Sequence, residues 1–569
     1  MLEYSFSNHR LILTDEDGNS EDFCEEARVV KVITRLPLNK VSVEVLLWSP
    51  QMGENRIECS HAEITSNPIS VLAQYGLSLA NTKQNASILA NVLLDTKRKA
   101  KQTYRHDILG FGTLAKQRVF FGAKLVGSQV NSRHINKVAL SSAGTFAEWR
   151  QGVSQYAQDH PPLQLALALG ACSPVAALLL EQDLLKAIPL VALIGESSTG
   201  KTSALKLMAS IWGKPAIGTG VIDTLLDTPN RFFANLGQKH GFPAFIDETS
   251  CLTNWDFTRE IYNLSLGKER GRCNPDGSPR PENTWRNAII FTGETSMLAQ
   301  SNQNGGLMAR LLELTLPWTK DQESSDNMTN FLAGCYGTAY VPLIEHLLAM
   351  DPQEIVKQFQ EAQEQIRDRF SSISSVDRRL TNLFALVLMT AKIIKLAWDI
   401  PIDEDGILAL LPQHSPTTML QEQANRFHSL LMEKVLANTI HFPEKGALRG
   451  AQSIWGYKDE YHGRPCIWIC ADQFNTIGRG FGEDNFHAIK RQLVKDGLLA
   501  KFHDRYAIRR ELLGLPVTCY CVYPSSTPCT TTTSPKPPRV SRPKPLRLLV
   551  EEDEEMEPPQ ATEQDGDCA

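Results

Sequence analysis

The spacing of apolar positions divides the first part of the chain into short strand-like and helix-like segments. Residues 29–34 (VVKVIT) and 40–48 (KVSVEVLLW) are rich in β-branched residues and predict strands. Residues 68–80 and 86–100 carry apolar residues at three- and four-residue spacing and predict helices. We therefore expect a mixed, β-rich N-terminal domain over residues 1–125.

The pattern changes along the rest of the chain. Residues 140–320 form the predicted core. The segments 144–157 and 161–182 predict helices, and residues 191–320 then alternate strand-like and helix-like segments, which is typical of a parallel sheet with helices on its faces. Residues 321–445 predict a mostly helical region. Residues 450–523 predict an α+β module in which Phe486, Ile489 and Leu493 share one helix face before a hairpin, the outline of a winged helix. Residues 524–569 are Pro/Thr-rich and then acidic, which predicts a disordered tail.

A glycine-rich turn stands where a predicted strand meets a predicted helix. The apolar run Val191–Ile194 precedes Gly195-Glu-Ser-Ser-Thr-Gly200-Lys-Thr202, and a helical pattern follows. Such a turn points backbone N–H groups at phosphate oxygens, and the helix N-terminus adds partial positive charge. Lys201 is expected to reach the β- and γ-phosphates, and Thr202 to offer its hydroxyl to Mg²⁺. We expect ATP to contact the residues of this loop: Gly195, Glu196, Ser197, Ser198, Thr199, Gly200, Lys201, Thr202 and Ser203.

Two further predicted strands end in polar residues. Residues 242–246 lead into Asp247-Glu248, and residues 287–291 lead into Thr292. Asp247 is expected to hold Mg²⁺, and Glu248 to activate the attacking water as general base. Thr292 is a candidate for contacting the γ-phosphate or that water, with Glu294 a weaker one.

Arginines could complete such a site. Arg310 lies in the apolar run 305–314, where it either pairs with a local carboxylate such as Glu313 or reaches a neighbouring subunit's nucleotide as an arginine finger. The sequence does not favour either interpretation of Arg310 over the other. Arg378 and Arg379 are weaker candidates for a lid over the phosphates.

Residues 267–280 predict an exposed hairpin, because Asn-Pro-Asp-Gly is a strong turn signal. This loop carries Lys268, Arg270, Arg272 and Arg280. Cations at this place could grip DNA phosphates in the pore of a ring-shaped motor, or they could be ordinary surface charges. A second basic cluster, at 97–106, could also contact a nucleic acid backbone. We favour the interpretation that these cations complement the negative end of a helix dipole.

Composition narrows the class of protein. The 569 residues have a net charge of −6, and nine carboxylates without any Lys or Arg lie in residues 548–569, so the folded body is nearly neutral. The sequence shows no run of about eighteen apolar residues, which a membrane span needs, and the N-terminus lacks a signal pattern, so we expect a cytoplasmic protein. The spacing of Cys466, Cys470, Cys519 and Cys521 is a poor match to a zinc site.

The segments GTFAEWRQGV, GESSTGKTSALKLMASIWG, FIDETS, YNLSLGKERGR and WRNAIIFTGE together resemble the family called domain of unknown function 927. The resemblance covers roughly residues 25–330. It implies a helicase-like P-loop ATPase of phages and mobile elements that acts on DNA in replication or defence. The NPDGSPRPEN insertion in the basic loop departs from the plainer loop of that family.

We therefore expect a P-loop NTPase core of the AAA+ or helicase type that uses ATP and Mg²⁺. The first hypothesis is a ring-forming DNA motor acting on single-stranded DNA, with a hexamer as one candidate size. The second is a nucleotide-dependent switch or scaffold, such as a helicase loader or defence component, that does not unwind DNA. A small-molecule kinase is disfavoured. The acidic tail is expected to bind a protein partner or to compete with DNA.

Overall fold

The computed structural model describes residues 3–525 except for 137–138, 225–228, 238, 250–255, 299–306, 308, 371–376, 412–415, 448–452 and 482. It does not describe the side chains of 229–230, 377–379, 416–419 and 483–485. Residues 1–525 form one compact unit. The predictions for Arg378, Arg379 and the tail after Ser525 lie outside the described residues.

The N-terminal part contains two sheets. The first is antiparallel and contains β1 (Glu3–Ser7), β2 (Arg10–Thr14) and β3 (Ser20–Glu25). The second has the order β11-β7-β4-β5-β6, with β4 (Ala27–Leu36), β5 (Lys40–Ser49), β6 (Gly53–Ser60), β7 (Lys101–His106) and β11 (Ser132–His134). The strands expected at 29–34 and 40–48 are thus present as β4 and β5. Helices α1 (His61–Ser66), α2 (Pro68–Ala73) and α3 (Lys83–Lys99) supply apolar residues to the same core.

The basic cluster after α3 is largely matched by neighbouring groups. The Lys99 ammonium lies 2.6 Å from Asp95, and Arg105 lies 3.2 Å from Glu58. His106 is buried, and its ring nitrogens contact Ser132 Oγ and the Gly122 carbonyl. Burial lowers the pKa of His106 to about 4. These contacts favour a structural role for the cluster.

A small sheet joins the chain before the phosphate loop to the central part. Its order is β10-β9-β8-β14, with β8 (Leu109–Leu114), β9 (Gln117–Phe121), β10 (Leu125–Val126) and β14 (Lys239–His240). At Gly110 a Cβ atom would lie 2.1 Å from the His240 carbonyl oxygen, so the β8–β14 pairing requires glycine there. Phe120 and Val126 belong to the hydrophobic core of the central part.

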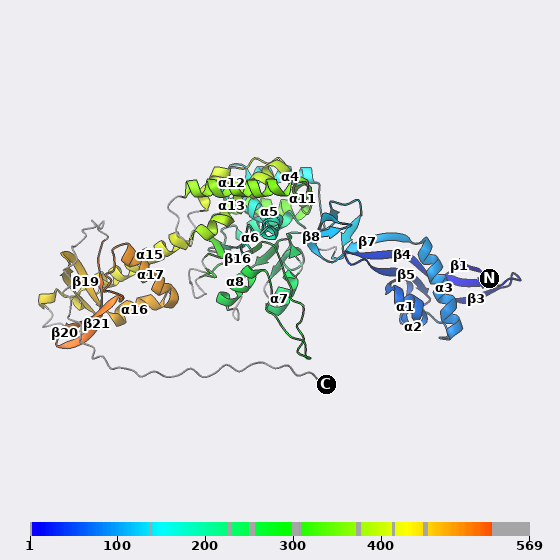
Figure 1. The fold of residues 1–569 in the computed structure, drawn as a ribbon, viewed down its shortest axis with the longest axis horizontal. Helices are drawn as coiled ribbons and strands as arrows, with labels where there is room; N and C mark the ends of the chain where they lie inside the picture. The colour runs from blue at the N-terminus through cyan, green and yellow to red at the C-terminus, as the bar shows by residue number, and fades with distance from the viewer. Residues whose placement is uncertain are drawn as a thin grey trace, which may run out of the picture. The chain divides into compact units, whose positions relative to one another are not determined.

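The central sheet is entirely parallel (Figure 1). Its order is β13-β15-β16-β12-β17, with β12 (Leu190–Ile194), β13 (Ile222–Thr224), β15 (Ala244–Asp247), β16 (Ile289–Gly293) and β17 (Leu311–Leu314). The alternation expected from the sequence is therefore present. Because the strands are parallel, the carboxyl ends of β12, β15 and β16 meet at one edge of the sheet, where binding sites of open α/β sheets lie.

Helices pack on this sheet. They are α5 (Pro161–Glu181), α6 (Lys201–Ser210), α7 (Pro229–Leu236) and α8 (Phe257–Leu266), and α4 (Phe146–Ala157) packs on α5. The helical region expected at 321–445 contains α10 (Gln322–Gly334), α11 (Tyr340–Ala349), α12 (Pro352–Arg369), α13 (Asp377–Trp398), α14 (Glu404–Leu410) and α15 (Pro416–Ala437), with two short 3₁₀ turns, η3 (Thr439–His441) and η4 (Lys445–Ala447).

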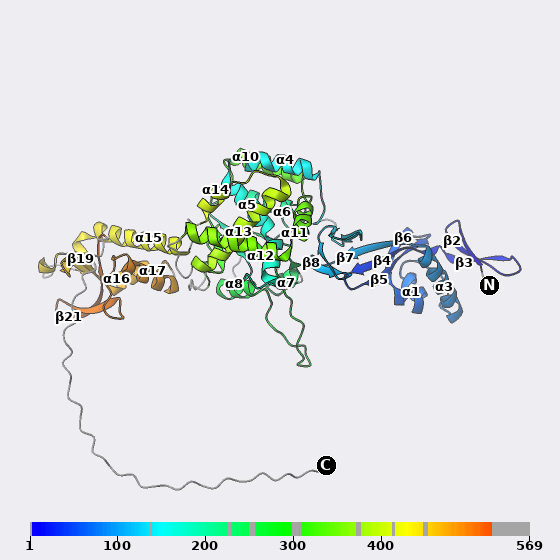
Figure 2. The same ribbon diagram turned by 45° about the horizontal axis from the view of Figure 1, so that its top comes forward.

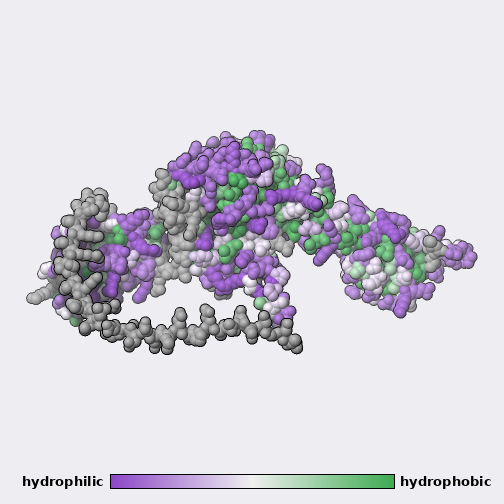
Figure 3. All heavy atoms as spheres, viewed as in Figure 1, coloured by the Kyte–Doolittle hydropathy of each residue, from purple (hydrophilic) through white to green (hydrophobic). Residues whose placement is uncertain are grey.

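Two of these helices are apolar enough to cross a membrane by length and composition, so the expectation that no segment is long enough was too strong. They are Pro161–Glu181 and Leu380–Trp398, whose most apolar windows are 94% and 67% buried inside the protein. A buried core helix passes the same test. Burial of α5 agrees with this explanation, and Figure 3 shows hydrophilic side chains over the helices at the top of the central part.

The C-terminal part has an antiparallel sheet of order β18-β19-β21-β20. The strands are β18 (Gly456–Tyr461), β19 (Arg464–Cys470), β20 (Ala507–Leu512) and β21 (Leu515–Val522), and the helices are α16 (Ala471–Arg479) and α17 (Glu483–Lys495). Phe486, Ile489 and Leu493 are buried together, and the expected hairpin follows as β20–β21.

The four cysteines of this part lie on two neighbouring strands. Cys470 is opposite Cys519 across β19 and β21, and a thiol contact between Cys466 and Cys521 lowers the pKa of Cys466. Within the described ranges, no group of three or more His, Cys, Asp or Glu residues is arranged to hold a metal ion.

Candidate nucleotide-binding site

The glycine-rich turn joins the carboxyl end of β12 to the first residue of α6. Gly195 and Gly200 have φ values of 148° and 81°, and Ser198 also has a positive φ, 68°. At Gly200 a Cβ atom would lie 2.5 Å from Thr319 Oγ1, so both backbone angle and space require glycine. The Trp318 N–H donates to the Thr199 carbonyl at 2.9 Å and anchors the turn from the segment after β17.

The Lys201 side chain folds back over this turn. Its ammonium donates to the Gly195 carbonyl at 2.8 Å and to the Glu196 carbonyl at 2.6 Å. Lys201 is only 8% exposed, so its charge is held inside the turn. A cation held at the N-terminus of a helix is suited to binding phosphate, because the helix dipole and the loop N–H groups act in the same direction.

Three hydroxyl and carboxylate groups meet beside the turn. The Asp247 Oδ1 atom at the end of β15 accepts a hydrogen bond of 2.6 Å from Thr292 Oγ1 on β16. Thr202 Oγ1, in the first turn of α6, lies 3.4 Å from the same carboxylate oxygen. The structure therefore brings together Thr202, Asp247 and Thr292 as the sequence analysis expected.

The Thr292 hydroxyl connects the two acidic residues. It also accepts the backbone N–H of Glu248 at 3.0 Å, and Thr292 is 2% exposed. A hydroxyl that donates to Asp247 has no second proton to donate to a phosphate. These contacts favour a positioning role for Thr292 over direct contact with the γ-phosphate.

Glu248 has an unusual backbone conformation. Its φ is 60°, in the left-handed region that residues other than glycine rarely adopt. The hydrogen bond from its N–H to Thr292 holds this conformation. Strained residues of this kind are concentrated at functional sites, because the surrounding structure must offset their cost.

Glu294 contacts the glycine-rich turn, although the sequence indicated it only as a weaker candidate. Ser197, in the turn, donates a short hydrogen bond to the Glu294 carboxylate at the end of β16. Glu294 thus links the turn to β16. In the sequence, the only indication of a role for Glu294 was its position directly after a predicted strand. The sequence could not show that its carboxylate contacts the turn.

Ser203 is directed away from the turn. Its hydroxyl lies 2.6 Å from Ser325 Oγ of α10. Ser203 was expected to contact ATP, but this position suits it better to attach α6 to the helical region. The remaining expected residues, Glu196, Ser197, Ser198 and Thr199, lie in the turn itself.

Arg310 immediately precedes β17. Its guanidinium lies over the Tyr262 ring of α8 at 4.6 Å from the ring centroid. The buried Glu313 carboxylate accepts hydrogen bonds from Ser296 Oγ at 2.6 Å and the Leu298 N–H at 3.0 Å. Burial raises the pKa of Glu313. Glu313 is therefore stabilised by neutral donors. Both interpretations of Arg310, a local ion pair and an arginine finger, stay predictions.

The basic loop forms the expected hairpin, which projects from the central part between α8 and β16 (Figures 1 and 2). Lys268 pairs with Thr284 and Cys273 with Pro279 in antiparallel bridges. All residues from 270 to 282 are exposed, including Arg270, Arg272 and Arg280. The Lys268 ammonium is 3.9 Å from Glu282 and is 58% exposed.

The groups present fit a magnesium nucleotide. Hydroxyl and carboxylate oxygens are the ligands that Mg²⁺ prefers, and Thr202 and Asp247 supply one of each. Asp247, Glu248 and Glu294 also place three carboxylates at this edge of the sheet. A triphosphate would be repelled by these charges unless Lys201 and a divalent cation offset them.

Comparisons with known proteins connect this fold to solved structures. No curated protein shows significant similarity to this chain. A solved structure described as "SCCmec type IV Cch - active helicase" superposes with a TM-score of 0.62, covering 91% of this chain and 96% of that one at 18% identity. At that identity the likeness shows a shared fold.

A structure of the C-terminal region of NrS-1 covers 86% of this chain and 95% of that one, at 10% identity and a TM-score of 0.24. That score is too low to support an argument. The sequence resemblance to a family is confirmed independently of both structures. Residues 41–284, which include the turn, Asp247, Glu248 and the whole hairpin, match the family model described as Domain of unknown function (DUF927).

Proposed function

We propose that the protein is an ATP-hydrolysing, helicase-like motor that acts on single-stranded DNA as a ring of identical subunits. The observation that carries the proposal is the network at the carboxyl ends of β12, β15 and β16. There Lys201 and Thr202 begin a helix beside Asp247, Glu248 and Thr292. The fold shared with a helicase structure and the match to a family expected in phages and mobile elements support it.

Each group has a proposed role in hydrolysis. The turn N–H groups and Lys201 bind the β- and γ-phosphates, and Thr202 and Asp247 hold Mg²⁺, which offsets phosphate charge. Glu248 orients and deprotonates the attacking water, and Thr292 fixes the positions of Asp247 and Glu248. In this proposal Arg310 completes the site of a neighbouring subunit, which requires an oligomer.

The hairpin supplies the proposed grip on DNA. Its cations are exposed and lie directly between α8 and β16, so a change at the nucleotide site can reach it through β16. Contacts to phosphates are indifferent to base identity, which suits a motor that moves along a strand. We assign the C-terminal part, as a winged-helix-like module, to docking on DNA or a partner, and we place the protein in the cytoplasm.

Stimulation of ATP hydrolysis by single-stranded DNA tests the proposal. The parent protein should hydrolyse ATP with Mg²⁺ and respond to DNA. The variant Lys268→Ala/Arg270→Ala/Arg272→Ala should keep basal hydrolysis, bind DNA more weakly for every sequence and lose the stimulation. Its log–log salt dependence should become shallower by about 2, from roughly 0.7 per lost phosphate contact.

A control removes three exposed cations elsewhere, with Lys357, Arg367 and Arg369 of α12 changed to alanine. This protein should behave as the parent does. ATP hydrolysis that DNA does not affect would instead favour the nucleotide-dependent switch or scaffold. Loss of basal hydrolysis in the hairpin variant alone would indicate that Arg270 or Arg272 reaches a nucleotide at a subunit boundary.

A further inference from the structure

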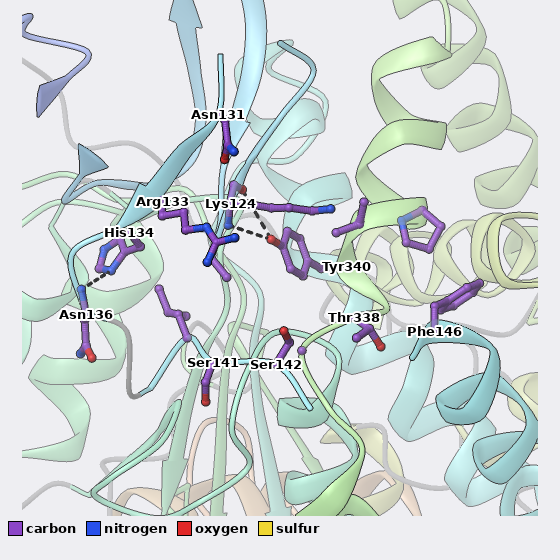
Figure 4. Close-up of a pocket in the computed structure, with 15 residues that line it drawn as sticks. Lys124, Asn131, Arg133, His134, Asn136, Ser141, Ser142, Phe146, Thr338 and Tyr340 are labelled. Carbon is purple, nitrogen blue, oxygen red and sulfur yellow. Dashed lines mark hydrogen bonds between the residues drawn. The ribbon is translucent and has the colours of Figure 1, made fainter. Parts of the chain in front are cut away.

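A polar pocket of about 660 Å³ lies between the loops around β10 and β11 and the beginning of α11 (Figure 4). Its walls come from segments some 200 residues apart in the chain. They are held together by Tyr340, whose hydroxyl accepts the Lys124 backbone N–H at 3.0 Å. The residues that line it are Ala123, Lys124, Asn131, Arg133, His134, Asn136, Leu140, Ser141, Ser142, Phe146, Gly337, Thr338, Tyr340, Val341 and Pro342.

This pocket is separate from the candidate nucleotide site. The Gly337 N–H donates to the Ser210 carbonyl at 2.6 Å, and the Tyr340 N–H donates to the Ile211 carbonyl at 3.1 Å. Both acceptors are at the C-terminal end of α6, whose first residue is Lys201. A ten-residue helix is about 15 Å long, so the pocket and the glycine-rich turn lie near opposite ends of α6.

Two cations stand side by side on one wall. Lys124 and Arg133 face each other in an antiparallel bridge, so their side chains leave the same face of the backbone. Like charges directly opposite one another are destabilising. No Asp or Glu lines the pocket, and in the described part of the chain neither cation forms an ion pair. The pocket therefore supplies no negative charge to balance Lys124 and Arg133.

The beginning of α11 adds positive potential to the same space. The helix starts at Tyr340, its N-cap Ala339 provides no side-chain cap, and Thr338, Val341 and Pro342 line the pocket. The N-terminus of a ten-residue helix carries partial positive charge. The Tyr340 N–H is already bonded to the Ile211 carbonyl and Pro342 has no N–H, so the helix contributes mainly its dipole. Two cations reinforced by this dipole in one cavity are suited to a phosphate group.

The opposite wall offers an apolar surface. Phe146, the first residue of α4, is half-buried and lies across the pocket from Arg133 (Figure 4). Asn131, Asn136, Ser141 and Ser142 supply neutral hydrogen-bonding groups. A volume of about 660 Å³ is within the range of small-molecule sites. An aromatic ring and a pair of cations that line one cavity are the groups that can bind a base and its phosphate.

We propose that this pocket binds a nucleotide, with its phosphate on Lys124 and Arg133 and its base against Phe146. The nucleotide is either free or one unit of a single strand, and the chemistry of recognition is the same. Binding needs no hydrolysis of ATP, so the proposal does not depend on the motor function proposed above.

The test measures binding to the full-length protein with saturating MgADP present to occupy the glycine-rich turn. The probes are 5′-dTMP and a 15-nucleotide oligo(dT). In Lys124→Ala/Arg133→Ala, affinity for at least one probe should fall tenfold or more, as expected for losing two charge-assisted contacts. Phe146→Leu should weaken binding of the same probe by roughly threefold or more, from the loss of stacking.

Three controls separate the pocket from general effects. Lys357→Ala/Arg367→Ala removes equal charge from α12 and should bind as the parent does. Lys124→Arg/Arg133→Lys keeps both charges and should retain most of the affinity. Both cations are exposed, so thermal unfolding of the alanine variant should match that of the parent.

The two probes identify the source of the ligand. If the alanine variant binds both probes more weakly, the ligand of the pocket is a free nucleotide. If it binds only oligo(dT) more weakly, the ligand is one nucleotide of a single strand. The pocket substitutions can also be made in the Lys268→Ala/Arg270→Ala/Arg272→Ala protein. If they still lower the affinity for oligo(dT) there, the pocket contributes to DNA binding independently of the hairpin. The proposal is overturned if the alanine variant binds both probes as the α12 control does.

Discussion

Thr292 gives the sharpest test of the candidate site, because one hydroxyl holds both acidic residues. Replacing Thr292 with valine keeps the shape and removes the hydroxyl. Asp247 loses a donor at 2.6 Å and the Glu248 N–H loses its acceptor at 3.0 Å, in a place only 2% exposed. We expect Thr292→Val to impair hydrolysis although valine cannot clash.

The magnitude follows from these two bonds. A hydrogen bond to a charged group contributes about 1.5–3 kcal/mol, and leaving a buried N–H unpaired costs about 1–3 kcal/mol. Relaxation of the strand ends should recover part of this sum. We therefore expect a loss of about 2 kcal/mol of transition-state stabilisation, which corresponds to roughly thirtyfold in kcat.

The assay is steady-state ATP hydrolysis with Mg²⁺, together with binding of a fluorescent ATP analogue. Binding should change less than kcat, because Lys201 and the turn are untouched. Thr292→Ser keeps the hydroxyl and should stay within about threefold of the parent, as expected when only a methyl group is lost. The reasoning is refuted if Thr292→Val keeps kcat within about twofold of the parent, since the hydroxyl would then position nothing that matters.

Three other predictions concern hydrolysis and the tail. Lys201→Ala should abolish ATP hydrolysis, whereas Glu248→Gln should bind ATP and fail to turn it over; hydrolysis by Glu248→Gln at the parent rate would remove Glu248 as the base. Mixing Arg310→Ala with Lys201→Ala protein should restore activity at hybrid interfaces, and mixtures no more active than either variant, with assembly confirmed by sedimentation, would favour a local role for Arg310. A protein ending at Ser525, whose carbonyl accepts a hydrogen bond from Arg464 at 3.1 Å, should hydrolyse ATP normally and bind DNA at least as tightly; loss of folding would show that the tail is structural.

Local patterns predicted the glycine-rich turn and its strand and helix, since all the residues involved are consecutive in the chain. Asp247 and Thr292 could also be placed, because the carboxyl ends of parallel strands meet at one edge. The contact between Ser197 and Glu294 could not be predicted, since it depends on how closely the turn approaches β16.

The pocket beside Tyr340 was beyond sequence reasoning for a related reason. Its two cations lie at 124 and 133 and its helix N-terminus at 340, and no periodic pattern connects them. Helix α2 shows a different limit. The apolar pattern extended to residue 80, but the helix ends at Ala73 and Gly76 adopts a φ of 99° soon after it. Backbone conformation therefore overrode side-chain spacing there.

The left-handed conformation of Glu248 has a consequence for the stability of the protein. A residue with a Cβ costs about 1–2 kcal/mol more than glycine in that conformation. Glu248→Gly should therefore yield a protein that resists unfolding better and no longer turns over ATP, with part of the gain offset by glycine's freedom in the unfolded chain. Selection for thermal stability alone would therefore favour the loss of Glu248, and if Glu248 is the base that we propose, this position is one where stability is exchanged for catalysis.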